Sequence, residues 1–293
     1  MKSLVPIVLS PFVLLLQLGI AASAPIEVID DRGKKHRFVQ APTRIVSLAP
    51  SQTEIIAHLD QLPRLVGRTV HCDFPPDVSK VPSLGQAFPP SYERIMALRP
   101  DVVLMMSGTV AVRQRLETLG VPVVVSQPRT VSDVAKVMVR LAKMMGVTEI
   151  GQAKAQAFRA ALAHSPDVPE QGRPLVFYEV WPRPLTTAGP RTFAADLIRL
   201  AWGTNLVQTG RDEWPRISPE TVVMKDPAVV LVGSDARRSA WLAERGPWTT
   251  TRAARAGRVY TLANADEFSR PGPRILGALK WLRAKLAQPS AAR

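Results

Sequence analysis

The stretches SYERIMALRPDVVLMMSG, at residues 91–108, and SPETVVMKDPAVVLVGS, at residues 218–234, repeat one another. Both read Ser-x-Glu, then six residues, then Pro-x-Val-Val-Leu, with no gap between the parts. A Ser before the first turn and a Glu within it favour the start of a short helix, because the hydroxyl caps a free N–H group and the carboxylate complements the helix dipole. The Pro ends that helix, and the apolar run behind it predicts a parallel strand buried on both faces. Two such units predict two α/β lobes.

The repeated carboxylates, Glu93 and Glu220, are predicted to point away from their own helix ends. A capping box needs the acidic residue three positions after the Ser, whereas here it comes two positions after. Each side chain is therefore free to face outward. The alternative explanation of the repeat is chance, since any two doubly wound lobes contain similar short helix–strand units.

Length, charge and cysteine content limit the class of protein. At 293 residues the chain is long enough for about two domains, in agreement with the repeat. A net charge of +14 would suit nucleic acid, but the basic residues are spread singly and form no aromatic-interleaved stripe or known nucleic-acid motif. We therefore expect no nucleic-acid partner. Cys72 is the only cysteine, which excludes an intrachain disulfide.

Residues 1–24 have the pattern of a secretory signal peptide. Lys2 gives a positive start, Leu4 to Ile20 is apolar, and Ala22-Ser23-Ala24 offers small residues for cleavage. An uncleaved membrane anchor is the alternative, which Pro6 and Pro11 within so short a run disfavour. We expect an exported, periplasmic protein.

The remaining chain divides into two lobes and a linker. Residues 25–147 are predicted to form the N-terminal α/β lobe, 148–165 a linker helix and 166–293 the C-terminal α/β lobe. The segment from Thr148 to His164 is Ala-rich and lacks Pro, so a single helix of roughly 25 Å is expected to join the lobes as a stiff rod. In the first lobe, Ser51 to Glu54 has the spacing of a capping box that opens a helix. The expected fold class is α/β, with two doubly wound α/β lobes, a single long helix between them and a ligand cleft between the lobes.

Further motifs, in order along the chain, give the sequence a family resemblance. They are Arg44-Ile-Val-Ser-Leu-Ala-Pro-Ser-x-Thr-Glu, Cys-Asp-Phe-Pro-Pro at 72–76, the first repeat, Trp214-Pro-x-Ile-Ser-Pro-Glu220, and Arg258-Val-Tyr. The sequence resembles the helical-backbone (class III) periplasmic substrate-binding proteins of ABC importers over nearly all of the mature chain. The members that bind vitamin B12 are the most similar, and those that bind haem or iron-siderophores are relatives.

The resemblance implies a monomer that holds a small ligand between its lobes and docks onto the transmembrane permease dimer of an ABC importer. One acidic residue on each lobe of such proteins meets arginines of the permease. Glu93 and Glu220 stand at the matching positions, which gives the repeated outward carboxylates a function. The expected ligand is cobalamin or a related corrinoid, and haem or an iron-siderophore chelate is the alternative.

The resemblance also implies a set of ligand contacts. Trp214, Asp266 and Arg270 stand where the vitamin B12-binding members contact their ligand: an indole stacks on a flat ring, and a polar edge suits amide groups. His71, Met106 and Glu267 stand near positions that are aromatic in those members. Phe88 and Trp181 can supply the missing apolar area. The expected ligand-binding residues are therefore His71, Phe88, Met106, Trp181, Trp214, Asp266 and Arg270.

An exported enzyme and a free-metal receptor are the competing functions. The chain has neither Gly-x-Ser-x-Gly nor His-Glu-x-x-His, and its four His residues are widely separated in sequence. We expect no catalytic residues, no resident metal and no cofactor apart from the transported ligand. Whether His71 or Cys72 ligates a metal in that ligand stays open.

Overall fold

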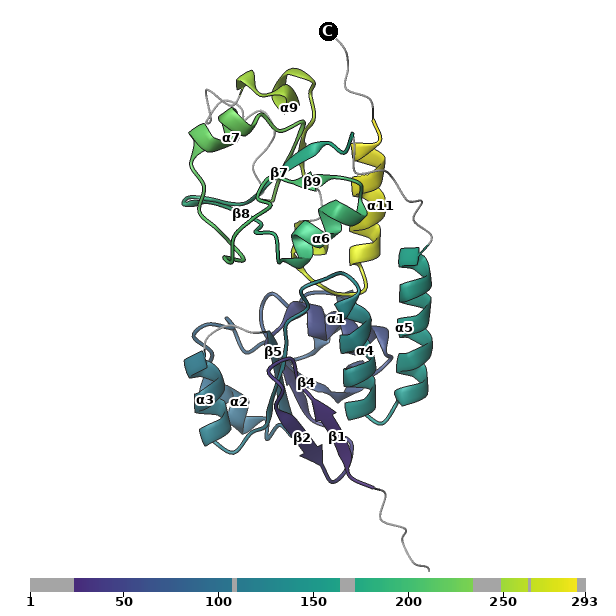
Figure 1. Cartoon of the computed structure of the whole chain (residues 1–293). Helices are drawn as coiled ribbons and strands as arrows, with labels where there is room; N and C mark the ends of the chain where they lie inside the picture. The colour runs from purple at the N-terminus through teal and green to yellow at the C-terminus, as the bar shows by residue number, and fades with distance from the viewer. Residues whose placement is uncertain (1–23, 107–109, 164–171, 234–248, 263–264, 289–293) are drawn as a thin grey trace, which may run out of the picture.

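The computed structural model describes residues 24–106, 110–163, 172–233, 249–262 and 265–288, in two α/β lobes stacked end to end (Figure 1). The predicted signal peptide, apart from Ala24, lies outside these residues. Within the described residues no helix is long and apolar enough to cross a membrane.

The N-terminal lobe contains a four-stranded parallel sheet. Its strands are β3 (Ile45–Ser47), β4 (Leu65–Arg68), β5 (Val102–Met106) and β6 (Val123–Ser126), in the order β4-β3-β5-β6. Helices α1 (Pro50–His58) and α4 (Asp133–Met144) cover one face, and α2 (Tyr92–Ala97) and α3 (Val110–Thr118) cover the other. Alternate residues of β5 therefore enter different cores: Leu104 packs in the cluster with α1 and α4, and Val103 in the cluster with α2 and α3.

An antiparallel hairpin, β1 (Ile26–Ile29) and β2 (Lys35–Phe38), closes the β6 edge of this lobe. Its turn lies at residues 30–33, and Gly33 there has φ +81°. The side chain of Asp30 is fully buried and accepts the backbone N–H of Val125 in β6. Arg32 and His36 also bond this carboxylate, so the buried charge is paired.

The C-terminal lobe repeats the same topology. Its parallel strands β7 (Leu175–Pro182), β9 (Thr204–Asn205), β10 (Val229–Val232) and β11 (Val259–Thr261) lie in the order β9-β7-β10-β11. In both lobes the spatial order is thus second, first, third, fourth strand. Helices α6 (Phe193–Leu200) and α11 (Ile275–Leu286) pack on one face, and α7 (Pro219–Lys225) and α9 (Arg252–Arg255) on the other. The prediction of two doubly wound α/β lobes is confirmed.

The repeated stretches occupy equivalent positions in the two lobes. Helix α2 leads into β5 and helix α7 into β10, which are the third strands of their sheets. The Oγ atoms of Ser91 and Ser218 accept backbone N–H groups at 3.4 and 3.2 Å, as predicted for helix caps. Glu93 and Glu220 are both exposed.

Short elements that the sequence did not predict extend the loops. Strand β8 (Leu185–Thr187) pairs antiparallel with the end of β7, so Trp181 lies within a strand. Two 3-10 helices, η1 (Leu62–Arg64) and η2 (Pro76–Lys80), and the short helix α10 (Ala265–Ser269) complete the described elements.

The linker helix α5 (Thr148–Ala163) lies alongside α4 (Figure 1). The two helices can approach this closely because residue 151 is a glycine. A Cβ added to Gly151 would lie 2.1 Å from the Cβ of Ala142, which is too close for two carbon atoms. Lys154 of α5 also pairs with Asp60 of the same lobe at 2.7 Å. The stiff helix thus belongs to the N-terminal lobe by packing, and His164, expected at its end, lies outside the described residues.

Candidate ligand cleft and interlobe junction

The lobes meet at the carboxyl ends of their sheets. Gln127 follows β6, and its side-chain amide donates to the carboxylate of Glu213 in the other lobe at 3.3 Å. Arg129 approaches the same carboxylate at 3.7 Å. Beside them, the carboxylate of Asp196 in α6 accepts the backbone N–H of Val131 at 2.8 Å. In open α/β folds this edge of the sheet binds ligands.

A cavity of about 100 Å³ lies between the lobes at these contacts. Trp214 is 38% exposed there, and its ring meets Phe193 edge-on, with 6.2 Å between centroids. Across the cavity, the sulfur of Met106 accepts a hydrogen bond from Ser51 at 3.6 Å. The lining residues from the N-terminal lobe are Met106, Gln127, Pro128 and Arg129, and those from the C-terminal lobe are Arg191, Thr192, Phe193, Glu213 and Trp214.

An ion-pair junction forms the second region of contact between the lobes. The carboxylate of Glu54 in α1 is almost fully buried, and Arg274 donates to both of its oxygens, at 3.0 and 2.6 Å. The guanidinium of Arg270 lies 3.5 Å from Glu54, 2.6 Å from Asp73 and 2.9 Å from Asp266. We call Glu54, Asp73, Asp266, Arg270 and Arg274 the ionic junction.

The contacts of the ionic junction shift the pKa values of Asp73, Arg270 and Arg274. Partial burial lowers the pKa of Arg270, but the hydrogen bond to Asp73 and the charges of Asp266, Asp73 and Glu54 together raise it. The hydrogen bond to Glu54 raises the pKa of Arg274. Burial raises the pKa of Asp73, and the hydrogen bond and charge of Arg270 outweigh this effect, so the pKa lies below its ordinary value.

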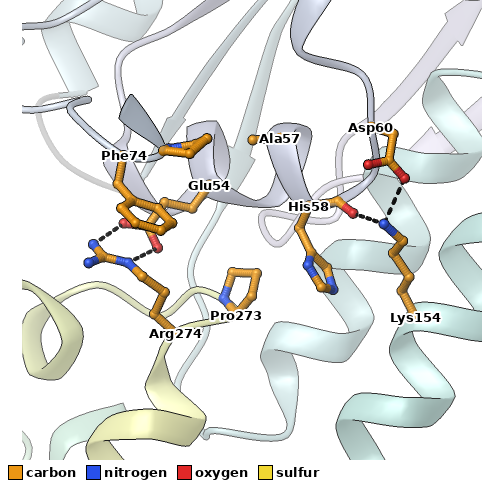
Figure 2. A pocket seen from close by; sticks show the side chains of 9 residues that line it. Glu54, Ala57, His58, Asp60, Phe74, Lys154, Pro273 and Arg274 are labelled. Carbon is orange, nitrogen blue, oxygen red and sulfur yellow. Dashed lines mark hydrogen bonds and ion pairs between the residues drawn. The ribbon is translucent and has the colours of Figure 1, made fainter. Parts of the chain in front are cut away.

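A hollow of about 390 Å³ lies beside the ionic junction, between α1, α5 and the segment before α11 (Figure 2). Glu54 and Arg274 form one side of it, with the ring of Phe74 4.0 Å from the Arg274 guanidinium. His58 and Lys154 form the other side. Burial, together with the charge of Lys154, lowers the pKa of His58. All charged groups here except His58 already have partners of opposite sign.

Comparison with known proteins identifies the family. Residues 45–265 match the family described as periplasmic binding protein. The chain belongs to the periplasmic binding protein family. A vitamin B12-binding protein of Yersinia pestis is 28% identical over 256 residues, which are 85% of this chain and 88% of that protein.

Solved structures of the family share the fold of this periplasmic binding protein. A periplasmic haem-binding protein from Pseudomonas aeruginosa has a TM-score of 0.73 at 26% identity, over 86% of this chain and 95% of its own. The periplasmic vitamin B12-binding protein BtuF of Vibrio cholerae has a TM-score of 0.71 at 24% identity, over 84% and 97%. The predicted family is therefore confirmed.

The predicted ligand contacts fall into three groups in this binding protein. Met106 and Trp214 line the cavity between the lobes, from opposite sides. Asp266 and Arg270 pair with one another and, through Arg270, with the other lobe. The remaining three predicted residues, His71, Phe88 and Trp181, are exposed and do not line this cavity.

Two of these exposed residues make hydrogen bonds within their own lobe. A ring nitrogen of His71 lies 3.0 Å from the side-chain oxygen of Gln86, and the indole of Trp181 donates to the carbonyl of Arg183 at 3.1 Å. Cys72 is buried, with its sulfur 3.2 Å from the hydroxyl of Thr69. His71 and Cys72 are neighbours in sequence, but one faces solvent and the other the core.

Sequence reasoning assigned Glu54 the wrong partner. It predicted a capping box from Ser51 to Glu54, whereas α1 begins at Pro50, and Ala49 is its N-cap without a side-chain bond. Ser51 instead bonds Met106, and Glu54 bonds Arg274, which is 220 residues away in the chain. The cleft residues Gln127, Arg129, Arg191, Phe193 and Glu213 were also missed, because no local motif marks a residue that meets another lobe.

Proposed function

We propose that this chain is a periplasmic protein that captures cobalamin or a related corrinoid between its lobes and delivers it to an ABC importer. The observation that carries the proposal is the pairing of Trp214 with Phe193 opposite Met106 at the carboxyl edges of both sheets. The similarity to a vitamin B12-binding protein along 85% of the chain supports the choice of ligand. The protein acts as a binding protein and not as an enzyme, and the predicted signal at residues 1–24 takes it to the periplasm.

The chemistry of the cleft suits a large flat ring. Aromatic and thioether side chains bind such a face by dispersion and burial of apolar area, and the side-chain amide of Gln127 can meet amides at its edge. Pockets for ligands of this kind occupy about 300–1,000 Å³. The lobes must therefore separate at the cavity, which now holds about 100 Å³, before a corrinoid enters.

Haem or an iron-siderophore chelate is the second candidate ligand. Arg129 and Arg191 line the same cavity, and guanidinium groups bind carboxylates such as the propionates of haem. The thioether of Met106 is a soft group that suits a metal centre. The structural similarity to a haem-binding protein agrees with this candidate.

The docking partner is proposed to be the permease dimer of the importer. Glu93 and Glu220 begin equivalent helices, α2 and α7, and expose one carboxylate on each lobe. Two like charges in related positions can meet a symmetric pair of cationic sites and fix the orientation of docking.

Titration of the mature protein with cyanocobalamin and with haemin tests the ligand. Binding between the lobes is expected to quench the fluorescence of Trp214 and to shift the visible absorption of the ligand. A Trp202→Phe variant serves as control, because Trp202 lies against Arg283 and does not line the cavity. If neither ligand binds with a dissociation constant below about 0.1 mM, the proposal is wrong.

A further inference from the structure

Arg129 and Arg191 stand between two adjoining hollows. Both line the cavity that contains Trp214, and both line a second hollow of about 320 Å³. The first hollow contains the rings of Phe193 and Trp214 and the thioether of Met106, whereas no aromatic side chain lines the second, which adds Arg199 to the two shared arginines. The second hollow is lined by Arg129, Thr130, Pro190, Arg191, Thr192, Ala195, Asp196 and Arg199.

The charges around these hollows leave one guanidinium without an acidic partner. Arg129 lies 3.7 Å from Glu213, and Arg199 lies 2.6 Å from Asp196. Arg191 donates to the backbone carbonyl of Arg211, and among the described residues no carboxylate pairs with it. That single bond fixes one end of the side chain and leaves other N–H donors of the guanidinium for a ligand.

Glu213 shows that the contact between the lobes accepts a carboxylate. It extends from the C-terminal lobe, accepts the amide of Gln127 at 3.3 Å and approaches Arg129, both of which follow β6 in the N-terminal lobe. Arg191 belongs to the same lobe as Glu213, in the segment before α6. An anion placed between Arg129 and Arg191 would thus bridge the lobes, in competition with Glu213.

We propose that the two hollows form one bipartite site, in which the Trp214 side takes the flat ring and Arg191 with Arg129 takes an anionic group of the ligand. This inference rests on the proposed function and narrows it to ring ligands that carry a phosphodiester or a carboxylate. A guanidinium offers two parallel N–H donors to such a group, which favours it over a neutral amide. The anion also ties the lobes together, so its binding favours the closed form.

Matched pairs of ligands distinguish the two sources of negative charge. Cyanocobalamin carries a phosphodiester and dicyanocobinamide does not, while haemin carries two carboxylates and its dimethyl ester carries none. The wild type is expected to prefer the anionic member of whichever pair it binds. This preference should decrease as the salt concentration increases, because salt screens exposed charges.

The Arg191→Gln variant is expected to bind the anionic member about tenfold to 100-fold more weakly and the uncharged member with unchanged affinity. Arg191→Lys, which keeps the charge but not the paired donors, should fall between. Glu213→Gln should strengthen binding of the anionic member, because it removes the competing carboxylate. Arg216→Gln is the control, since Arg216 is exposed and lines neither hollow.

The outcomes separate this inference from the proposed function. If the wild type binds none of the four ligands, both fail. If it binds a ring ligand but Arg191→Gln weakens both members of the pair equally, or neither, the bipartite site is wrong and the proposed function stands. Circular dichroism and the melting temperature of each variant establish that a loss of affinity does not come from unfolding.

Discussion

The two regions where the lobes meet differ in how completely their polar groups are satisfied. In the ionic junction the carboxylate of Glu54 is 2% exposed, and both of its oxygens accept hydrogen bonds from Arg274. In the cleft, Trp214 is 38% exposed, and Arg191 donates to a backbone carbonyl and pairs with no carboxylate of the described residues. A satisfied, buried network resists separation, because parting the lobes there would leave charges without partners. Exposed rings and donors are instead groups that a ligand can still bind.

This difference indicates where the molecule moves. The junction joins α1 to the segment before α11, and separating the buried carboxylate of Glu54 from Arg274 would cost several kcal/mol by order of magnitude. The contacts at the cleft are one 2.8 Å hydrogen bond from a backbone N–H to Asp196, a 3.3 Å hydrogen bond and a 3.7 Å ion pair, and they include no buried charge network like that of Glu54. We therefore expect the lobes to open at the cleft and to pivot at the junction.

The largest expected effect follows from breaking the junction. Glu54→Ala removes the only carboxylate that bonds Arg274 within 3.5 Å among the described residues, and leaves two guanidiniums partly buried without it. We expect the free energy of unfolding to fall by about 3–5 kcal/mol, as measured by urea denaturation. Glu93→Ala, at an exposed helix start, is the matched control and should cost less than about 1 kcal/mol. Equal losses of unfolding free energy in the two variants would show that Glu54 in the junction stabilises the fold no more than an exposed helix-start residue does.

The next effect concerns the cleft. Trp214→Ala should weaken ligand binding by about 1–3 kcal/mol and leave the unfolding midpoint nearly unchanged, because an exposed ring contributes little to the core. Calorimetry measures the affinity. Trp181→Ala refines the comparison, since Trp181 is 60% exposed and does not line the cavity. A larger loss of ligand affinity in Trp181→Ala than in Trp214→Ala would indicate that the ligand binds at the end of β7 and not in this cavity.

The two regions also differ in how far the sequence predicts them. The repeat, the buried strands and the helix at Thr148 follow from local patterns, because apolar periodicity and caps act over a few residues. Trp214 and Met106 were predicted through the family resemblance, because related proteins bind their ligands with residues at equivalent positions of the chain. Glu54 was not, since its local spacing matches a capping box and its actual partner is 220 residues away. Local patterns carry no information about contacts between lobes.

The docking carboxylates belong to neither region, so they test whether transport and capture are separable. Glu93→Lys combined with Glu220→Lys should abolish transport and permease association, because it places like charges against the proposed permease arginines. Ligand affinity should stay within about twofold, since neither residue lines the cavity. Each Lys at a helix start should cost about 0.3–1 kcal/mol of stability. Normal transport by the double variant would show that neither Glu93 nor Glu220 is needed for docking.

The smallest expected effect is the pH dependence at the exposed rim of the junction. The pKa of Asp73 lies below its ordinary value of 3.8, because the hydrogen bond and charge of Arg270 outweigh the effect of burial. A carboxyl group with a lowered pKa stabilises the folded state above its ordinary pKa, and this contribution disappears as the pH falls through the folded pKa.

The side chain of Asp73 is 54% exposed, so solvent screening limits the contribution to below about 1 kcal/mol. The difference in unfolding free energy between the wild type and Asp73→Asn should therefore be present at about pH 5 and vanish near about pH 2. High salt should reduce the difference at the higher pH, because the pair at Arg270 is partly open to solvent. If the difference is the same at both pH values, Asp73 does not bind Arg270 as an ion, and the junction consists of Glu54 and its arginines alone.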